Sequence, residues 1–178
     1  LSPLFLITAI AIRLQDGGKA IYAPTRLTKG GREFKMYKFR SMRMDAEELL
    51  DELMDQNEMI GPASKMKDDP RITRVGHFIR KTSLDELPQL WNIFKGDMSL
   101  IGPRPLLVSY LPWYTEREKL RHSIRPGLTG LAQVNGRNAI SWEDKFDYDV
   151  HYVDNVTFIG DWKIIFKTVG IVLKRDGI

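Results

Sequence analysis

The chain has 178 residues, of which 43% are hydrophobic and 28% are charged. This length fits one domain with a sizeable core, and the composition excludes a disordered protein and a polytopic membrane protein. The 178 residues contain no cysteine, which excludes disulfides and thiolate metal sites within them and suits a reducing compartment. The net charge of +4 indicates an anionic partner such as nucleic acid, lipid phosphate or a nucleotide.

An apolar run from Leu4 to Ile12 lies at the start of the sequence. It is shorter than the roughly 20 residues of a membrane-spanning helix, and it lacks the basic segment and cleavage site of a signal peptide. Ser2-Pro3 would kink a helix that continued from upstream. The residues alone leave two alternatives, namely a buried core helix and the tail of a membrane-embedded hairpin.

Two runs with apolar residues lie within residues 19–42 and flank Lys29-Gly30-Gly31-Arg32. The paired glycines predict a turn, so that the two runs form a hairpin. The second run, residues 34–40, carries the cations Lys38 and Arg40. They are either part of a solvated strand face or contacts for a phosphate group.

Residues 45–60 have the periodicity of an amphipathic helix, and Asp45 with Glu48 fits a capping box. A second helix is expected from Arg71 to Lys81, with Pro70 at its start. One side of this second helix is basic, which favours contact with an anion.

The adjacent carboxylates Asp85 and Glu86 follow that basic segment and are the strongest candidates for chemistry. A structural role competes with this interpretation, because Ser83 and Glu86 also fit a capping box and Asp85 would complement a helix dipole. In the catalytic interpretation one carboxylate attacks and the other holds a cation, since neighbouring helix residues face different directions. Pro88 predicts that the helix starts irregularly or later. Its expected core residues are Leu90, Trp91, Ile93 and Phe94, and Gly96 ends it.

Two loops hold an arginine beside proline: Pro103-Arg104-Pro105 and Arg125-Pro126. Proline stiffens the backbone, and an arginine presented in this way suits a phosphate or a nucleotide base. Between these loops, residues 115–122 are expected to form a short helix. Ala132 to Val134 is a candidate strand.

A helix is expected from Ser141, paired with Asp144 as its cap, to Val153, with Asp149 on its polar side. The last segment, Phe158 to Leu173, is amphipathic. It is either a core helix or an interfacial helix, since tryptophan with lysine suits a lipid headgroup region.

Six ordered motifs resemble the bacterial sugar transferase family, the monotopic polyprenyl-phosphate phosphoglycosyl transferases, and the resemblance runs from Ser2 to about Arg175. The motifs are Tyr37-Lys38-Phe39-Arg40-Ser41-Met42, Ser83-Leu84-Asp85-Glu86-Leu87, Lys95-Gly96-Asp97-Met98-Ser99, Gly102-Pro103-Arg104-Pro105, Arg125-Pro126-Gly127-Leu128-Thr129-Gly130 and Asn135-Gly136-Arg137-Asn138.

The resemblance implies transfer of a phosphosugar from a UDP-sugar to polyprenyl (undecaprenyl) phosphate, with release of UMP. It implies Asp85 as the nucleophile of a covalent aspartyl intermediate and Glu86 as a ligand of Mg²⁺. The positions that it implies for binding phosphates or the nucleotide are Lys38, Arg40, Arg80, Pro103, Arg104, Pro105, Arg125, Arg137 and Asp149.

The implied fold is α/β and mostly helical, with a small β-hairpin and short strands. Residues 1–16 would be the C-terminal half of a re-entrant membrane helix, and residues 17–178 the catalytic domain. The implied location is the cytoplasmic face of the bacterial inner membrane, at the first membrane step of exopolysaccharide, O-antigen or capsule synthesis. A homo-oligomer is compatible with this reading, and no nucleic acid is expected. The alternatives are a basic nucleic-acid-binding domain and a non-catalytic membrane scaffold.

Overall fold

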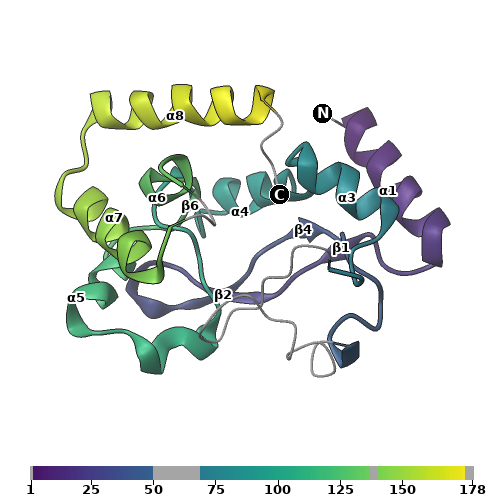
Figure 1. Ribbon diagram of the computed structural model, residues 1–178, viewed down its shortest axis with the longest axis horizontal. Helices are drawn as coiled ribbons and strands as arrows, with labels where there is room; N and C mark the ends of the chain where they lie inside the picture. The colour runs from purple at the N-terminus through teal and green to yellow at the C-terminus, as the bar shows by residue number, and fades with distance from the viewer. Residues whose placement is uncertain (1, 50–68, 137–139, 175–178) are drawn as a thin grey trace. The chain divides into compact units, whose positions relative to one another are not determined.

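The computed structural model describes residues 2–49, 69–136 and 140–174, and the chain forms two compact units (Figure 1). The first unit contains Leu1–Tyr22, Lys38–Leu87 and Gly177–Ile178. The second contains Ala23–Tyr37 and Pro88–Asp176. Helices predominate and the strands are short, as expected from the sequence.

The first unit has its core where a helix, a strand and a second helix meet. Ile12, Phe39 and Ile79 are buried there, and Phe39 lies opposite Ile21 in an antiparallel strand pair. The described elements of this unit are α1 (Ser2–Asp16), β1 (Ile21–Tyr22), β4 (Lys38–Phe39), α3 (Arg74–Lys81) and the 3-10 helix η3 (Leu84–Glu86).

Most of the apolar surface of α1 is exposed. Thr8 and Ile12 are buried, whereas Leu6, Ile7 and Leu14 are more than 60% exposed. The helix is therefore not buried on all sides: Ile12 contributes to the core, with Phe5 and Ala9 packed against it, while the other side is exposed. Within the described residues, none of the helices combines the length and apolarity that crossing a membrane requires. The re-entrant membrane helix stays a prediction.

The helix α3 begins later than expected, at Arg74 instead of Arg71, and Pro70 does not open it. Thr73 is its N-cap, and the Thr73 side chain accepts a hydrogen bond from the Gly76 amide at 2.9 Å. The preceding residues have other partners: Arg71 forms a buried ion pair with Asp69. Because these partners lie outside the helix, periodicity alone could not locate its start.

The predicted capping box at Ser83 is also wrong. Ser83 has a left-handed backbone, with φ of 56°, and its side chain makes no cap hydrogen bond. The regular helix is α4 (Gln89–Phe94), which begins after Pro88. The irregular start that Pro88 predicts is therefore confirmed.

The buried side of α4 agrees with the prediction at Ile93, which packs against the buried cluster of Phe34, Met36 and Met98, and differs from it at other positions. Trp91 and Phe94 are 56% and 80% exposed and stack on each other, whereas Asn92 is fully buried. The Asn92 amide accepts a hydrogen bond from the Tyr37 amide at 2.9 Å and donates one to the Lys35 carbonyl at 2.8 Å. A polar side chain is buried here because both of its ends are hydrogen-bonded.

The second unit contains the predicted hairpin. Its arms pair antiparallel with Arg26 opposite Phe34, and Gly30 and Gly31 in the turn have positive φ. The described elements of this unit, besides α4, are β2 (Thr25–Leu27), η1 (Lys29–Gly31), β3 (Glu33–Lys35), β5 (Ser99–Ile101), η4 (Val108–Trp113), α5 (Glu116–Lys119), η5 (Leu120–His122), β6 (Gly127–Thr129), α6 (Leu131–Val134), α7 (Trp142–Asp154) and α8 (Phe158–Leu173).

The candidate strand at Ala132 to Val134 is a helix, α6, and the strand β6 lies just before it. The strand β6 pairs in parallel with β5, and the two strands adjoin the loops that hold Arg104 and Arg125. A side chain at Gly127 would place Cβ 2.1 Å from the Gly102 amide nitrogen. Glycine therefore permits this close pairing.

The short helix at residues 115–122 and the helix from Ser141 are confirmed, and the Asp144 amide donates to Ser141 Oγ at 3.1 Å. Asp149, however, is buried in α7 and does not lie on its polar side. In α8 only Ile164 is buried, and most of its other apolar residues are exposed. Of the predicted helix at residues 45–60, all but the first residues lie outside the described chain.

Candidate functional site

The carboxylates Asp85 and Glu86 lie in η3 of the first unit, and both are partly buried. Lys38 reaches Glu86 from β4, which contacts η3: the distance between Lys38 Nζ and Glu86 Oε1 is 3.5 Å. The side chains of Lys38 and Glu86 are 18% and 22% exposed. An ion pair shielded to this extent is screened less than a surface pair.

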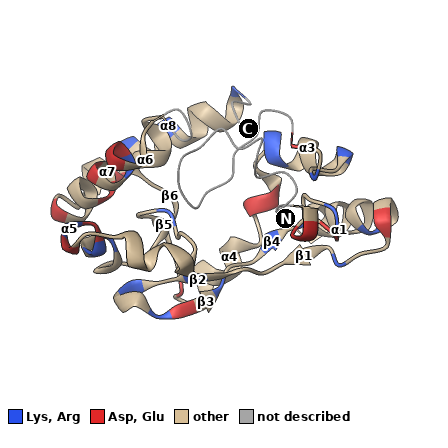
Figure 2. Cartoon of the chain, turned by 60° about the horizontal axis from the view of Figure 1, so that its bottom comes forward, with Lys and Arg blue, Asp and Glu red and all other residues tan. Residues whose placement is uncertain are grey.

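Arg80, in the last turn of α3, adds a second cation next to Asp85. Burial lowers the pKa of the Arg80 guanidinium, and the charges of Asp85 and Asp69 act in the opposite direction. Arginine stays charged under these conditions. Figure 2 shows basic residues on α3, and along the chain Arg80 and Lys81 at its end precede Asp85 and Glu86 of η3. The first unit therefore brings Lys38, Arg80 and the two carboxylates into one electrostatic cluster.

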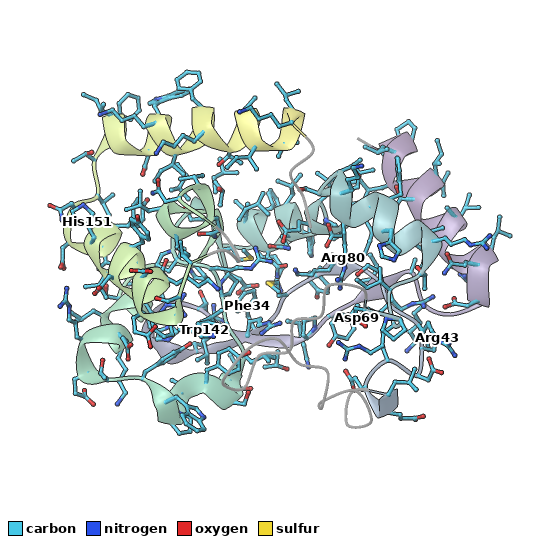
Figure 3. All side chains as sticks on the ribbon, in the orientation of Figure 1. Phe34, Arg43, Asp69, Arg80, Trp142 and His151 are labelled. Atoms are coloured by element: carbon cyan, nitrogen blue, oxygen red, sulfur yellow. The ribbon has the colours of Figure 1, made fainter. Side chains whose placement is uncertain are left out.

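The orientation of Arg80 is fixed by Ser41. Arg80 Nε donates to Ser41 Oγ at 2.8 Å, and the Ser41 carbonyl accepts from the Thr73 amide at 3.1 Å. Figure 3 labels Arg80, and also Asp69 in the same unit. The motif that contains Ser41 thus holds Arg80 in place through a side chain that the sequence analysis gave no role.

Arg40 has extensive protein contacts. Its guanidinium binds both carboxylate oxygens of Asp16 and donates to the carbonyls of Lys19 and Met42, and the residue is 8% exposed. The hydrogen bonds from Arg40 lower the pKa of the Asp16 carboxyl. They join the end of α1 to the residue that follows β4. A phosphate contact for Arg40 stays a prediction.

The two carboxylates fit one common way in which proteins bind Mg²⁺. Mg²⁺ is often held by one or two carboxylates together with substrate phosphates. Asp85 and Glu86 offer such carboxylate oxygens. Among the described residues, no group of three or more His, Cys, Asp or Glu side chains forms a metal cage of its own.

Five of the expected binding positions lie in the second unit. Pro103 and Pro105 are buried, whereas the Arg104 side chain between them is exposed. This is the arrangement that the stiffened loop predicts. Arg125 is also exposed, and Asp149 is 3% exposed. A further position, Arg137, lies outside the described residues.

Sequence reasoning gave Arg121 no functional part. It is buried and bonds to the Asp149 carboxylate, with 2.6 Å between Arg121 Nη2 and Asp149 Oδ2. The two residues are 28 positions apart, so no local pattern links them. What distinguishes Arg121 from other arginines is its burial, and burial cannot be read from one sequence.

A comparison with known families matches residues 1–175 to the family described as bacterial sugar transferase. The chain is 48% identical over 177 residues to UDP-galactose-lipid carrier transferase of Erwinia amylovora, covering 97% of this chain and 37% of that protein. It is 49% identical over 168 residues to undecaprenyl-phosphate galactose phosphotransferase of Salmonella typhimurium, covering 92% and 35%.

The uncharacterized sugar transferase EpsL of Bacillus subtilis is 47% identical over 177 residues, with 99% of this chain and 81% of that protein covered. The chain therefore spans little more than a third of the first two relatives and about four fifths of the third. The family match extends over nearly all of the 178 residues and includes all four residues of the carboxylate cluster, Lys38, Arg80, Asp85 and Glu86. The chain belongs to the bacterial sugar transferase family.

Proposed function

We propose that this chain is the catalytic part of an enzyme that transfers a phosphosugar from a UDP-sugar to polyprenyl phosphate. The products are polyprenyl-diphosphate-sugar and UMP. The observation that carries the proposal is the cluster of Asp85 and Glu86 with Lys38 and Arg80 in the first unit. Membership of the family, and a relative named for undecaprenyl phosphate and galactose, support the acceptor.

In the first step, a carboxylate oxygen of Asp85 attacks the phosphorus that carries the sugar. The bond from that phosphorus to the bridging oxygen breaks, and UMP leaves with the electron pair. In the second step, a phosphate oxygen of polyprenyl phosphate attacks the same phosphorus. The acyl phosphate bond breaks, and the Asp85 carboxylate is restored.

The cations beside Asp85 stabilise the charge that develops on the phosphoryl oxygens. One well-placed donor contributes roughly 3 kcal/mol to a transition state of this kind. Lys38, which pairs with Glu86, and Arg80, which interacts with the charge of Asp85, are two such cations of the first unit. Glu86 would hold Mg²⁺, which neutralises pyrophosphate charge when it is bound.

The remaining positions enter the proposal through the resemblance. Arg40, Pro103, Arg104, Pro105, Arg125, Arg137 and Asp149 are proposed to serve binding of phosphates or the nucleotide. The exposed apolar residues of α1 support the proposal that this helix enters the membrane, with catalysis on the cytoplasmic face of the bacterial inner membrane.

The ion pairs give no support to a nucleic-acid-binding domain. Arg71 and Arg121 are buried and bind Asp69 and Asp149. Arginines used in this way do not form a phosphate-binding face. Nucleic-acid binding that falls steeply with added salt would favour that alternative.

The test is intact-protein mass spectrometry of the full-length protein after incubation with UDP-sugars and Mg²⁺ in the absence of lipid acceptor. We expect a phosphosugar mass on the wild type, with release of UMP, and none on Asp85→Asn. Protein that forms no adduct but still turns over with polyprenyl phosphate would contradict the aspartyl intermediate. Absence of turnover with every UDP-sugar would contradict the proposed activity.

A further inference from the structure

Arg121 lies at the centre of a buried cluster in the second unit. Its Nη2 donates to Asp149 Oδ2 at 2.6 Å and to the Arg104 carbonyl at 2.7 Å. Its Nη1 donates to the Tyr114 hydroxyl at 3.2 Å. The guanidinium also lies over the rings of Tyr114 and Phe146, 5.7 and 5.4 Å from their centroids. These contacts fix the guanidinium from several sides.

The Arg104 carbonyl is one of two successive carbonyls that are held in this way. The preceding one, of Pro103, accepts a hydrogen bond from the Gly127 amide at 2.9 Å. The prolines on both sides of Arg104 are buried and have a fixed φ. The backbone at Arg104 is therefore held by Arg121 on one side and by β6 on the other, while the Arg104 side chain is exposed.

Asp149 balances the charge of Arg121. Both side chains are at most 4% exposed, so neither can reach a substrate in solution directly. Burial raises the pKa of the Asp149 carboxyl, and Arg121 beside it acts in the opposite direction. Without the carboxylate, the buried cation would remain uncompensated, which strongly destabilises the arrangement that holds Arg121 in place.

We propose that Arg121 and Asp149 are positioning residues that set the direction of the Arg104 side chain. Asp149 then influences substrate binding through Arg121 and the Arg104 carbonyl, not through contact with the substrate. This inference rests on the proposed function, in which Arg104 binds the nucleotide or its phosphates.

A double-mutant cycle of the full-length protein tests the inference. Arg104→Ala and Asp149→Asn are made singly and together, and kcat/KM is measured with the UDP-sugar that forms the covalent adduct. Since small misplacements of binding groups cost up to about 100-fold, we expect Asp149→Asn alone to lower kcat/KM by about tenfold or more, mainly through KM. In the Arg104→Ala background the same substitution should have almost no further effect. Independent, multiplying effects would overturn the proposal.

A matched control lies two residues away on the same helix. Asp147 pairs with Arg117 at 3.6 Å, and both of those side chains are 70% exposed. Asp147→Asn removes the same charge from α7 but touches neither Arg121 nor Arg104. It should leave kcat/KM unchanged. An equal loss in Asp147→Asn would mean that charge alone explains the effect, and it would contradict positioning.

Two further measurements cover loss of folding and loss of the assay. If Asp149→Asn does not fold, Tyr114→Phe takes its place in the cycle. It deletes the 3.2 Å hydrogen bond to Arg121, and the same non-additivity is expected.

Hydrogen exchange of the peptide that contains Arg104 needs no activity. Faster exchange in Asp149→Asn, but not in Asp147→Asn, supports positioning, and unchanged exchange overturns it. An inactive wild type would refute the proposed function and leave this exchange test valid.

Discussion

Ser41 has a direct effect on the proposed active site, because its hydroxyl is the acceptor for Arg80 Nε. Ser41→Ala removes that acceptor from a charged donor, an interaction that contributes about 1.5–3 kcal/mol. We expect kcat for phosphosugar transfer to fall by about tenfold or more, and the free energy of unfolding to fall by up to about 3 kcal/mol. Ser41→Thr keeps a hydroxyl and should restore most of the rate. A loss of the same size in Ser41→Thr would show that the hydrogen bond is not the cause.

His122 makes the stability of the second unit dependent on pH. Burial, and then the charge of Arg121, lower the pKa of His122 to about 4 from 6.5. Between these values the unfolded chain binds more protons than the folded one, so stability rises with pH. The contribution of neutral His122 should be lost as the pH falls from 6.5 towards 4.

Denaturant unfolding at pH 7 and pH 5 checks this dependence. The difference in unfolding free energy between the two pH values should be smaller in His122→Gln than in the wild type. An identical difference in both proteins would assign the pH dependence to other groups.

At the scale of single elements, α3 is built around a close contact. A Cβ on Gly76 would lie 1.9 Å from the Ser41 carbonyl oxygen, so alanine cannot fit without moving the backbone. Helix propensity alone would favour alanine by about 1 kcal/mol. We expect the clash to dominate, so that Gly76→Ala lowers the unfolding free energy. Gly170→Ala in α8 is the control, since its Cβ meets nothing within 4 Å and should stabilise the protein. Equal effects of the two substitutions would contradict the contact.

The elements that could be predicted are those with local signals. The hairpin has its paired glycines, and α7 has Ser141 with Asp144 at its start. The strand pair β5 and β6 could not be predicted, because it joins segments about 28 residues apart and has no periodicity of its own. The residues of the carboxylate cluster could be named because they lie in or next to local motifs. The roles of Ser41 and Arg121 depend on partners far away in the sequence, which only the structure shows.

At the scale of the whole molecule, each unit is assembled from separate parts of the chain. The chain passes from the first unit to the second between Leu87 and Pro88, directly after the two carboxylates. The expected site residues therefore divide between the units, with Asp85 in the first and Arg104 in the second. Motif order along the chain gave no indication of that division.

Membrane association is expected to depend on the exposed side of α1. Replacing Leu6, Ile7 and Ile10 with serine removes apolar surface that is 48–64% exposed. Flotation of the 178-residue chain with lipid vesicles should show a smaller bound fraction, at an unchanged unfolding midpoint. Ile12→Ala provides the contrast, because Ile12 is buried and its loss should cost about 2–5 kcal/mol of stability. Undiminished binding of the serine variant would contradict a membrane role for this side of α1.

The buried amide of Asn92 has one more consequence. It bonds the Lys35 carbonyl and the Tyr37 amide, two groups that point away from β2, since Met36 between them donates to Pro24. The Asn92 side-chain amide thus makes the two hydrogen bonds that one peptide group of a third strand would make. An open strand edge invites another chain to add to it and aggregate. At this point of the hairpin, the protein closes its own edge with one residue.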